Sequence, residues 1–202
     1  MSKVICTLDP NRCDSHLLLS QGFTVVTNDS IVDYNRKVLG TLAFAAGRVG
    51  FECSFWSNSR PTLGPVNLAS VGVASVLSPI NGTNSYVGGD TVTSTVDSCG
   101  LRPSTGASTN AAGIYRNNAL VGSAFQNCFE RQVISVLLDC TGAAPIVSFG
   151  VQGNYVGQAT LTAGLFYVPA VSVGCSTTAA DISAYLNFGQ YRLEFPNMWI
   201  NE

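Results

Sequence analysis

Residues 133–157 read VISVLLDCTGAAPIVSFGVQGNYVG, which is three apolar runs separated by turn-forming residues. The runs cover residues 133–138, 146–149 and 155–156, and they are rich in the β-branched and aromatic residues that favour strands. Gly, Asp and Asn lie between the runs, where the chain has to reverse its direction. This pattern predicts a three-stranded antiparallel meander whose first strand is buried on both faces.

Strand character recurs on both sides of the meander. In residues 49–56, Phe51, Cys53 and Phe55 alternate with small or polar residues, which predicts a strand with one face in a core. Further short strands are expected at residues 17–19, 23–26, 68–74 and 91–96. No segment has sustained helical periodicity, and the best helical candidate, residues 119–129, is short and carries Asn and Gly. The pattern of short strands and frequent turns indicates an all-β sandwich.

The composition limits the classes of partner. The 202 residues are enough for one all-β domain, and no repeat or linker divides them. Charged residues make up only 11% of the sequence, well below the roughly 25% usual in soluble domains. With a net charge of −2 the protein has no electrostatic footprint for nucleic acid or for an anionic membrane. No apolar run reaches the roughly 20 residues of a membrane-spanning helix.

Seven cysteines are scattered along the sequence, and no two of them form a CxxC pair. Zinc sites need closely spaced ligands, and the sequence has a single histidine, so we expect no metal and no cofactor. The odd count and the lack of a signal peptide favour folding in a reducing compartment. We expect buried free thiols that behave as small hydrophobic side chains.

Residues 78–112 are rich in Gly, Ser, Thr and Asn and poor in large apolar residues. Long loops inside compact domains are usually functional. We therefore expect a loop-rich insertion that contacts a partner. The alternative is a surface decoration without a binding role.

Several short motifs occur in order along the sequence. The first is Leu8-Asp9-Pro10, where Asp before Pro favours a turn, followed by Leu17, Leu19 and Ser20. The later motifs are Gly47-Arg48 with Phe51-Glu52, Val71-Gly72-Val73-Ala74, Ser98-Cys99-Gly100, Gly113 with Asn117, Pro169-Ala170-Val171-Ser172 and Asn187-Phe188-Gly189. Together they resemble the PRY/SPRY domain family over nearly the whole sequence. The polar, weakly charged style of the sequence is most similar to the stand-alone SPRY-like domains of bacteriophage virion proteins.

This resemblance implies a fold. It implies a SPRY-like antiparallel β-sandwich, in which two packed sheets have jelly-roll-like connections. We expect residues 1–202 to form a single domain of this kind, interrupted by the insertion at residues 78–112. Residues 133–139 are then expected to be the central strand of one sheet. The family often has Trp or Tyr where this protein has Gly50, which leaves a smaller side chain at that position.

Few residues are candidates for catalysis. The single histidine, His16, lies in a short N-terminal turn, where a structural role is favoured over membership of a catalytic triad. Most aspartates have Gly, Pro, Ser or Thr as neighbours, as turn-forming Asp residues do. Apart from Glu194, the internal glutamates on expected strands or strand edges are Glu52 and Glu130, so paired carboxylates for glycoside hydrolysis remain a distant alternative. We expect that the protein is not an enzyme.

The family resemblance also implies where a partner binds. SPRY domains bind peptides or proteins through loops at one rim of the sandwich, which here corresponds to residues 58–65 together with 78–97. Arg and Tyr are favoured at binding hot spots. The candidate anchor residues are Arg60, Pro61, Tyr86 and Arg102. The alternative is that the two arginines are solvated and that Tyr86 covers the edge of the core.

Two functions from different classes follow. The first is a structural or assembly protein of a bacteriophage particle, a capsid-decorating or tail component. It would fold in the host cytoplasm, reside in the virion, and bind other virion proteins or copies of itself. The second is a recognition or adhesion module that binds a peptide or a host-surface glycan through the rim loops.

Overall fold

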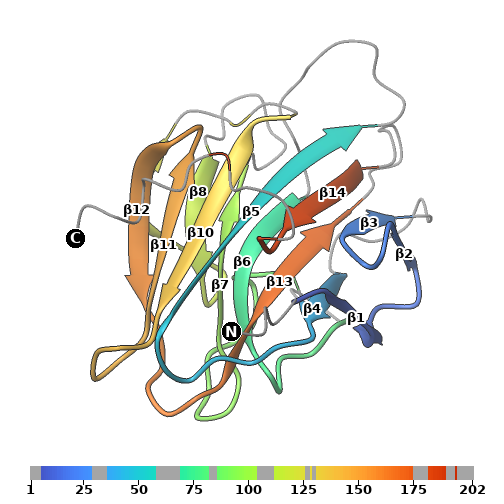
Figure 1. The fold of residues 1–202 in the computed structure, drawn as a ribbon. Helices are drawn as coiled ribbons and strands as arrows, with labels where there is room; N and C mark the ends of the chain where they lie inside the picture. Colours follow the sequence, from blue (N-terminus) through green and yellow to red (C-terminus); the bar gives the residue numbers. More distant parts are fainter. Residues whose placement is uncertain are drawn as a thin grey trace.

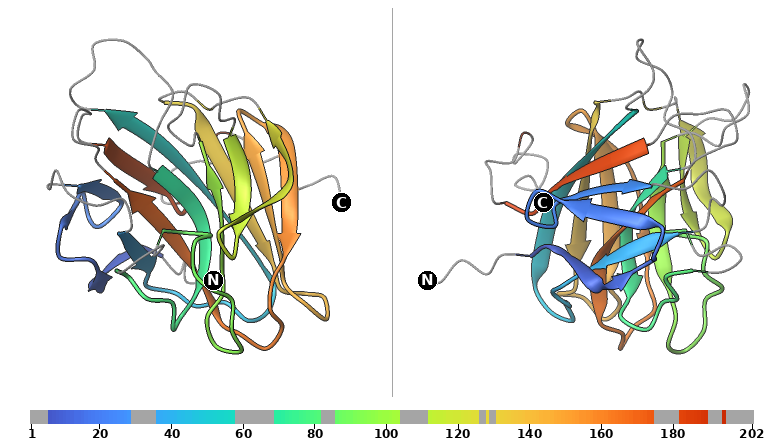
Figure 2. Two further views of the ribbon diagram at one scale, coloured as in Figure 1. Left: turned by 180° about the vertical axis from the view of Figure 1, so that it is seen from behind. Right: turned by 90° about the vertical axis from the view of Figure 1, so that its right-hand side faces the viewer.

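The computed structural model describes residues 6–28, 36–57, 69–81, 86–103, 112–125, 128, 131–174, 182–189 and 194. These residues form fourteen β-strands and no helix. The strands form two seven-stranded antiparallel sheets that pack face to face as two layers (Figures 1 and 2). The prediction of an all-β, SPRY-like antiparallel sandwich is confirmed at the level of the fold.

We call the first layer sheet A. Its strands in spatial order are β1 (Leu8–Cys13), β4 (Lys37–Gly40), β13 (Tyr167–Val173), β6 (Ala69–Ser75), β7 (Ser98–Arg102), β8 (Ala112–Arg116) and β9 (Ala119–Phe125). We call the second layer sheet B. Its strands in spatial order are β12 (Asn154–Thr160), β11 (Ile146–Val151), β10 (Val133–Asp139), β5 (Arg48–Ser57), β14 (Ile182–Asn187), β3 (Val25–Asn28) and β2 (Leu17–Ser20).

The meander at residues 133–157 is confirmed, and its last strand is longer than predicted. Strand β10 pairs with β11 and β11 pairs with β12, with β12 continuing to Thr160. The position of β10 differs from the expectation, because β5 is the central strand of sheet B and β10 lies beside it. Strand β5 is ten residues long and forms ladders with both β10 and β14, which explains how it takes the centre.

The prediction that β10 is buried on both faces was wrong in part. Ile134, Val136 and Leu138 point into the core, and each is almost fully buried. On the opposite face, Ser135 is buried but Leu137 is only half-buried. The side chains of this strand therefore alternate between one buried face and one partly exposed face. A continuous apolar run in the sequence is not sufficient evidence that both faces are buried.

The core lies between the two sheets. As predicted, Phe51, Cys53 and Phe55 of β5 point inward and are almost fully buried. They pack in one cluster with inward side chains of sheet A, including Val71 and Leu101. This packing fixes the register of each strand. Because side chains alternate along a strand, the register also determines which residues lie on the outer faces of the sheets.

Two local predictions were wrong. The expected turn at Asp9-Pro10 lies inside β1, an edge strand whose register is irregular and where a proline is tolerated. Residues 91–96 form no strand. Residues 119–129 were not predicted to be a helix, and their first part, residues 119–125, forms strand β9, which pairs with β8 across the tight turn at Asn117-Asn118.

The described part of residues 78–112 is more structured than a loop-rich insertion. It includes the whole of β7, and the described residues from 76 to 90 lie on the outer face of sheet A. Val87 joins a small apolar cluster there with Leu39, Ala74, Val168 and Ala170. Beneath the same segment, Asp90 forms an ion pair with Lys37, and both side chains are buried. We call the described residues 76–81 and 86–90 the cover segment.

Candidate partner-binding surface

The structure brings together two of the four predicted anchor residues. Tyr86 belongs to the cover segment over sheet A, and Arg102 ends β7 on the same outer face. Arg60 and Pro61 lie outside the described residues. Whether any of the four contacts a partner stays a prediction.

Arg102 is held between two aromatic rings. Its guanidinium carbon lies 4.4 Å from the centre of the Tyr86 ring and 4.8 Å from the centre of the Tyr115 ring. A cation over an aromatic face is attracted by the ring quadrupole, which contributes about 0.5–1 kcal/mol at exposed sites. Arg102 also donates a hydrogen bond from Nη1 to the Tyr86 hydroxyl oxygen, at 3.4 Å.

The Tyr86 hydroxyl group extends this series of contacts. It donates a hydrogen bond to Oδ1 of Asn118, which lies in the turn between β8 and β9. Tyr86 is only 8% exposed, and burial raises the pKa of its phenol, while the Arg102 charge acts in the opposite direction. The ring therefore covers the sheet and at the same time supports the arginine. The role of Tyr86 as a partner anchor stays a prediction.

Two glycines let these side chains approach the sheet. A Cβ atom at Gly100 would lie 2.6 Å from the backbone oxygen of Val87, so only glycine lets the cover segment lie flat on β7. A Cβ atom at Gly113 would lie 2.4 Å from Leu120 and 3.1 Å from the Tyr115 ring. Since Gly113 is opposite Arg102 in the ladder, its missing side chain makes room for the stack.

We call Tyr86, Arg102, Tyr115, Asn118 and Leu120 the Arg102 surface. Leu120 faces Tyr115 across the β8–β9 ladder and is 42% exposed, so it adds an apolar flank to the arginine. Tyr115 and Leu120 were not predicted as site residues. The alternation around the core residue Ile114 could have shown that Tyr115 points outward.

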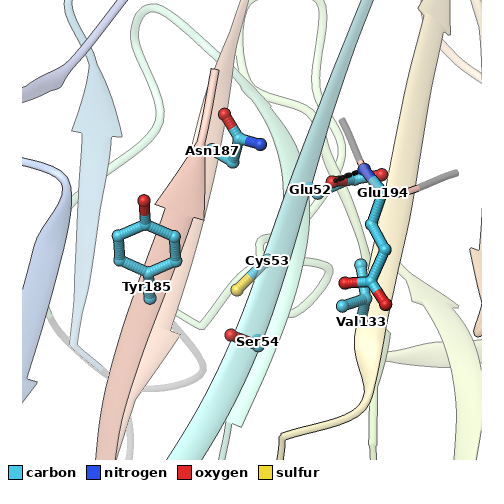
Figure 3. Close-up of a pocket in the computed structure, with 7 residues that line it drawn as sticks. All are labelled: Glu52, Cys53, Ser54, Val133, Tyr185, Asn187 and Glu194. Atoms are coloured by element: carbon cyan, nitrogen blue, oxygen red, sulfur yellow. Dashed lines mark hydrogen bonds between the residues drawn. The ribbon is translucent and has the colours of Figure 1, made fainter. Parts of the chain in front are cut away.

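A small cavity of about 140 Å³ lies on the outer face of sheet B (Figure 3). It is lined by Glu52, Cys53, Ser54, Val133, Tyr185, Asn187 and Glu194. The backbone nitrogen of Glu194 donates to Oε2 of Glu52 at 2.8 Å, whereas the Glu194 carboxylate lies over Val133 in Figure 3. The Glu52 carboxylate thus anchors the backbone at residue 194, which is a structural role. The expectation that the protein is not an enzyme stays a prediction.

The region of Gly50 also contains a cavity, of about 340 Å³. Its lining is almost entirely apolar and includes Phe44, Val49, Gly50 and Phe188. The position where the family often has Trp or Tyr therefore borders unfilled space in this protein.

His16 is held in a polar cluster. Its Nδ1 atom lies 3.0 Å from Oδ1 of Asp14, and Asp14 also accepts from Arg36 at 2.8 Å and from the His16 backbone. Burial alone would raise the pKa of Asp14, but these hydrogen bonds outweigh it and lower the pKa. The cluster fixes the segment between β1 and β2.

Six cysteines in the described residues are free thiols. Within the same residues, no group of three or more His, Cys, Asp or Glu side chains is placed to hold a metal ion. No helix in the described part of the protein is long and apolar enough to span a membrane.

Comparisons with known proteins identify the fold. No family model and no curated protein sequence matches this protein. Among solved structures, the TRIM65 PSpry domain matches with a TM-score of 0.60 at 14% identity, over 90% of this chain and 88% of that one. The SPRY domain of human HERC1 matches with a TM-score of 0.53 at 17% identity, over 92% and 99% of the two chains. Stonustoxin matches with a TM-score of 0.60 at 16% identity, over 90% of this chain but only 28% of the toxin chain. This protein therefore has a SPRY-like fold.

Proposed function

We propose that this protein is a non-enzymatic interaction protein and that its partner docks on the Arg102 surface. The observation that carries the proposal is the arginine over two tyrosine rings, with an exposed leucine opposite one of them. Binding hot spots are enriched in Tyr and Arg, and aromatic anchors lose little conformational entropy when they bind. The SPRY-like fold supports the proposal, since the similar domains belong to a fold that serves protein interaction.

The proposal is tested by removing the half-buried side chain of Tyr115 and the exposed side chain of Leu120. In the variant Tyr115→Ala with Leu120→Ser, we expect binding of the physiological partner to weaken at least about tenfold, as for the loss of hot-spot side chains. The matched control is Phe166→Ala, which removes an exposed aromatic residue just before β13 in the same sheet. Equal loss of binding in both variants, or in neither, would contradict the proposal.

More specifically, we propose that the protein is a structural component of a bacteriophage particle. It would be a capsid-decorating or a tail protein that binds other virion proteins or copies of itself. Its support is compositional, because a surface with 11% charged residues and many small polar ones suits burial against neighbouring subunits. We expect the protein to co-sediment with assembled particles. A monodisperse protein that never associates with particles would leave the alternative, a recognition module for a peptide or a host-surface glycan.

A further inference from the structure

We propose that the Arg102 surface recognises a carboxylate group on the bound partner. This inference rests on the proposed function, because it specifies the chemistry of the segment that docks there. The group is the side-chain carboxylate of an Asp or Glu, or the terminal carboxylate of a polypeptide, since both present the same two oxygens to the arginine.

The charge of Arg102 has no described acidic partner. Four of the six other basic side chains in the described residues have one: Arg36 with Asp14, Lys37 with Asp90, Arg48 with Asp139 and Arg116 with Asp97. For Arg102, the described residues provide two aromatic rings and one phenol oxygen, and no carboxylate within ion-pair distance. Its positive charge is balanced by no described acid.

One of the hydrogen-bond donors of Arg102 is already occupied. Guanidinium donors lie in the plane of the group, while aromatic rings are attracted to its faces. The guanidinium carbon lies over the rings of Tyr86 and Tyr115, and Nη1 donates to the Tyr86 hydroxyl oxygen. The described contacts leave Nε and Nη2, which are the pair of donors that a carboxylate engages through two parallel hydrogen bonds.

Asp90 is a nearby acid that could compete with an external carboxylate for Arg102. Asp90 is close enough to Tyr86 for its charge to raise the pKa of the phenol. Its carboxylate is, however, buried and paired with Lys37 under the cover segment. Asp90 therefore cannot turn toward Arg102 without leaving Lys37 as an unpaired buried charge, so the arginine stays available to an external anion.

The guanidinium group of Arg102 is preorganised for binding. A free arginine side chain loses much rotamer freedom when it is fixed in a complex. In this surface the tyrosine rings already restrict the guanidinium, and the missing side chain of Gly113 lets Leu120 and the Tyr115 ring pack closely beside it. Binding a carboxylate there has a smaller entropic cost than binding to an unrestrained surface arginine.

The test uses a displayed library of random peptides, selected on the immobilised full-length protein and counter-selected on the Tyr115→Ala, Leu120→Ser variant. We expect the surviving peptides to share an Asp or Glu at a fixed position, or to need a free C-terminal carboxylate. Amidating the C-terminus of synthetic copies distinguishes these two sources. Replacing the shared Asp by Asn, or Glu by Gln, should weaken binding at least about tenfold, as expected for a charge-assisted pair.

Arginine variants then assign the recognition to one residue. In Arg102→Gln, acidic peptides and their amide counterparts should bind equally weakly, and Arg102→Lys should recover only part of the difference because it lacks the fork of donors. The matched control is Arg48→Gln on sheet B, which should keep the full preference for the acid. Circular dichroism and thermal melting confirm that each variant is folded.

The outcomes separate the two proposals. Peptides that depend on Tyr115 and Leu120 but bind equally well as acid and amide would overturn the carboxylate inference and leave the docking surface intact. A selection that yields no peptide dependent on these two side chains would contradict the proposed function and the inference together. Acidic peptides whose preference survives in Arg102→Gln would also overturn the inference.

Discussion

Val136 and Leu137 are sequence neighbours on β10, yet their environments are opposite. Val136 is fully buried in the core between the sheets, whereas Leu137 is half-buried on the outer face of sheet B. We expect Val136→Asp to prevent folding, because an unpaired charge in the core costs several kcal/mol. Leu137→Asp should give a folded protein with a modestly lower melting temperature. Soluble yield and thermal melting of the two variants check this, and equal damage would contradict the placement of the two faces.

The ion pair between Lys37 and Asp90 is a second feature at the scale of single residues. Burial lowers the pKa of Lys37, and the neighbouring Asp90 opposes that effect. Asp90→Ala leaves the lysine buried without its acidic partner, and we expect a loss of about 3–5 kcal/mol in the free energy of unfolding. The double variant Lys37→Met, Asp90→Leu should recover most of this loss, since a buried ion pair is often replaceable by apolar groups. Urea denaturation compares the three proteins; a double variant no more stable than Asp90→Ala would contradict this account.

At the scale of elements, Asp97 connects two strands of sheet A with the loop between β12 and β13. Its carboxylate accepts hydrogen bonds from Arg116 of β8, from the backbone of Thr162 and from the hydroxyl group of Tyr167 in β13. Burial alone would raise the pKa of Asp97, but these donors outweigh burial and lower it. The carboxylate thus stabilises the fold in its ionised form.

This gives a pH dependence with a definite sign. Because the pKa of Asp97 is lower in the folded protein than in the unfolded one, its contribution is complete above about pH 4 and is lost as the pH falls through the folded value. We expect the free energy of unfolding to decrease below about pH 4, and the Asp97→Asn variant, though less stable, to show a shallower decrease. Denaturation curves between pH 2.5 and 6, roughly the span of carboxylate titration, measure both slopes. Identical slopes would contradict the role given to Asp97.

Strands with one face in the core were predicted well from the sequence. Phe51, Cys53 and Phe55 repeat with the period of a strand, and the sequence alone placed them correctly. Strand β9 was not predicted, because it forms by pairing with β8 across a tight turn, and this pairing outweighs weak local preference. The order of strands in each sheet depends on contacts between distant segments, which local periodicity does not contain.

At the scale of the whole molecule, the cover segment explains why the site was only half predicted. Its Gly- and Ser-rich sequence is typical of a loop, and its burial depends on a remote residue, Gly100 of β7, which allows close approach. Tyr86 and Arg102 were chosen by residue type and by the loop region that the family resemblance implies. That they meet over Tyr115 follows from the pairing of β7 with β8, which no short stretch of sequence reveals.

The free thiols have a consequence for how the motions of the molecule can be measured. Burial raises the pKa of the thiols of Cys53 in sheet B and of Cys99 in sheet A, so neither reacts with a labelling reagent while its sheet is closed. Each thiol becomes reactive only when its own element opens, and the rate of labelling then reports the free energy of that opening. The protein thus has natural probes in both layers. Mass spectrometry of the labelled peptides would show whether the two sheets separate in one cooperative event or open one at a time.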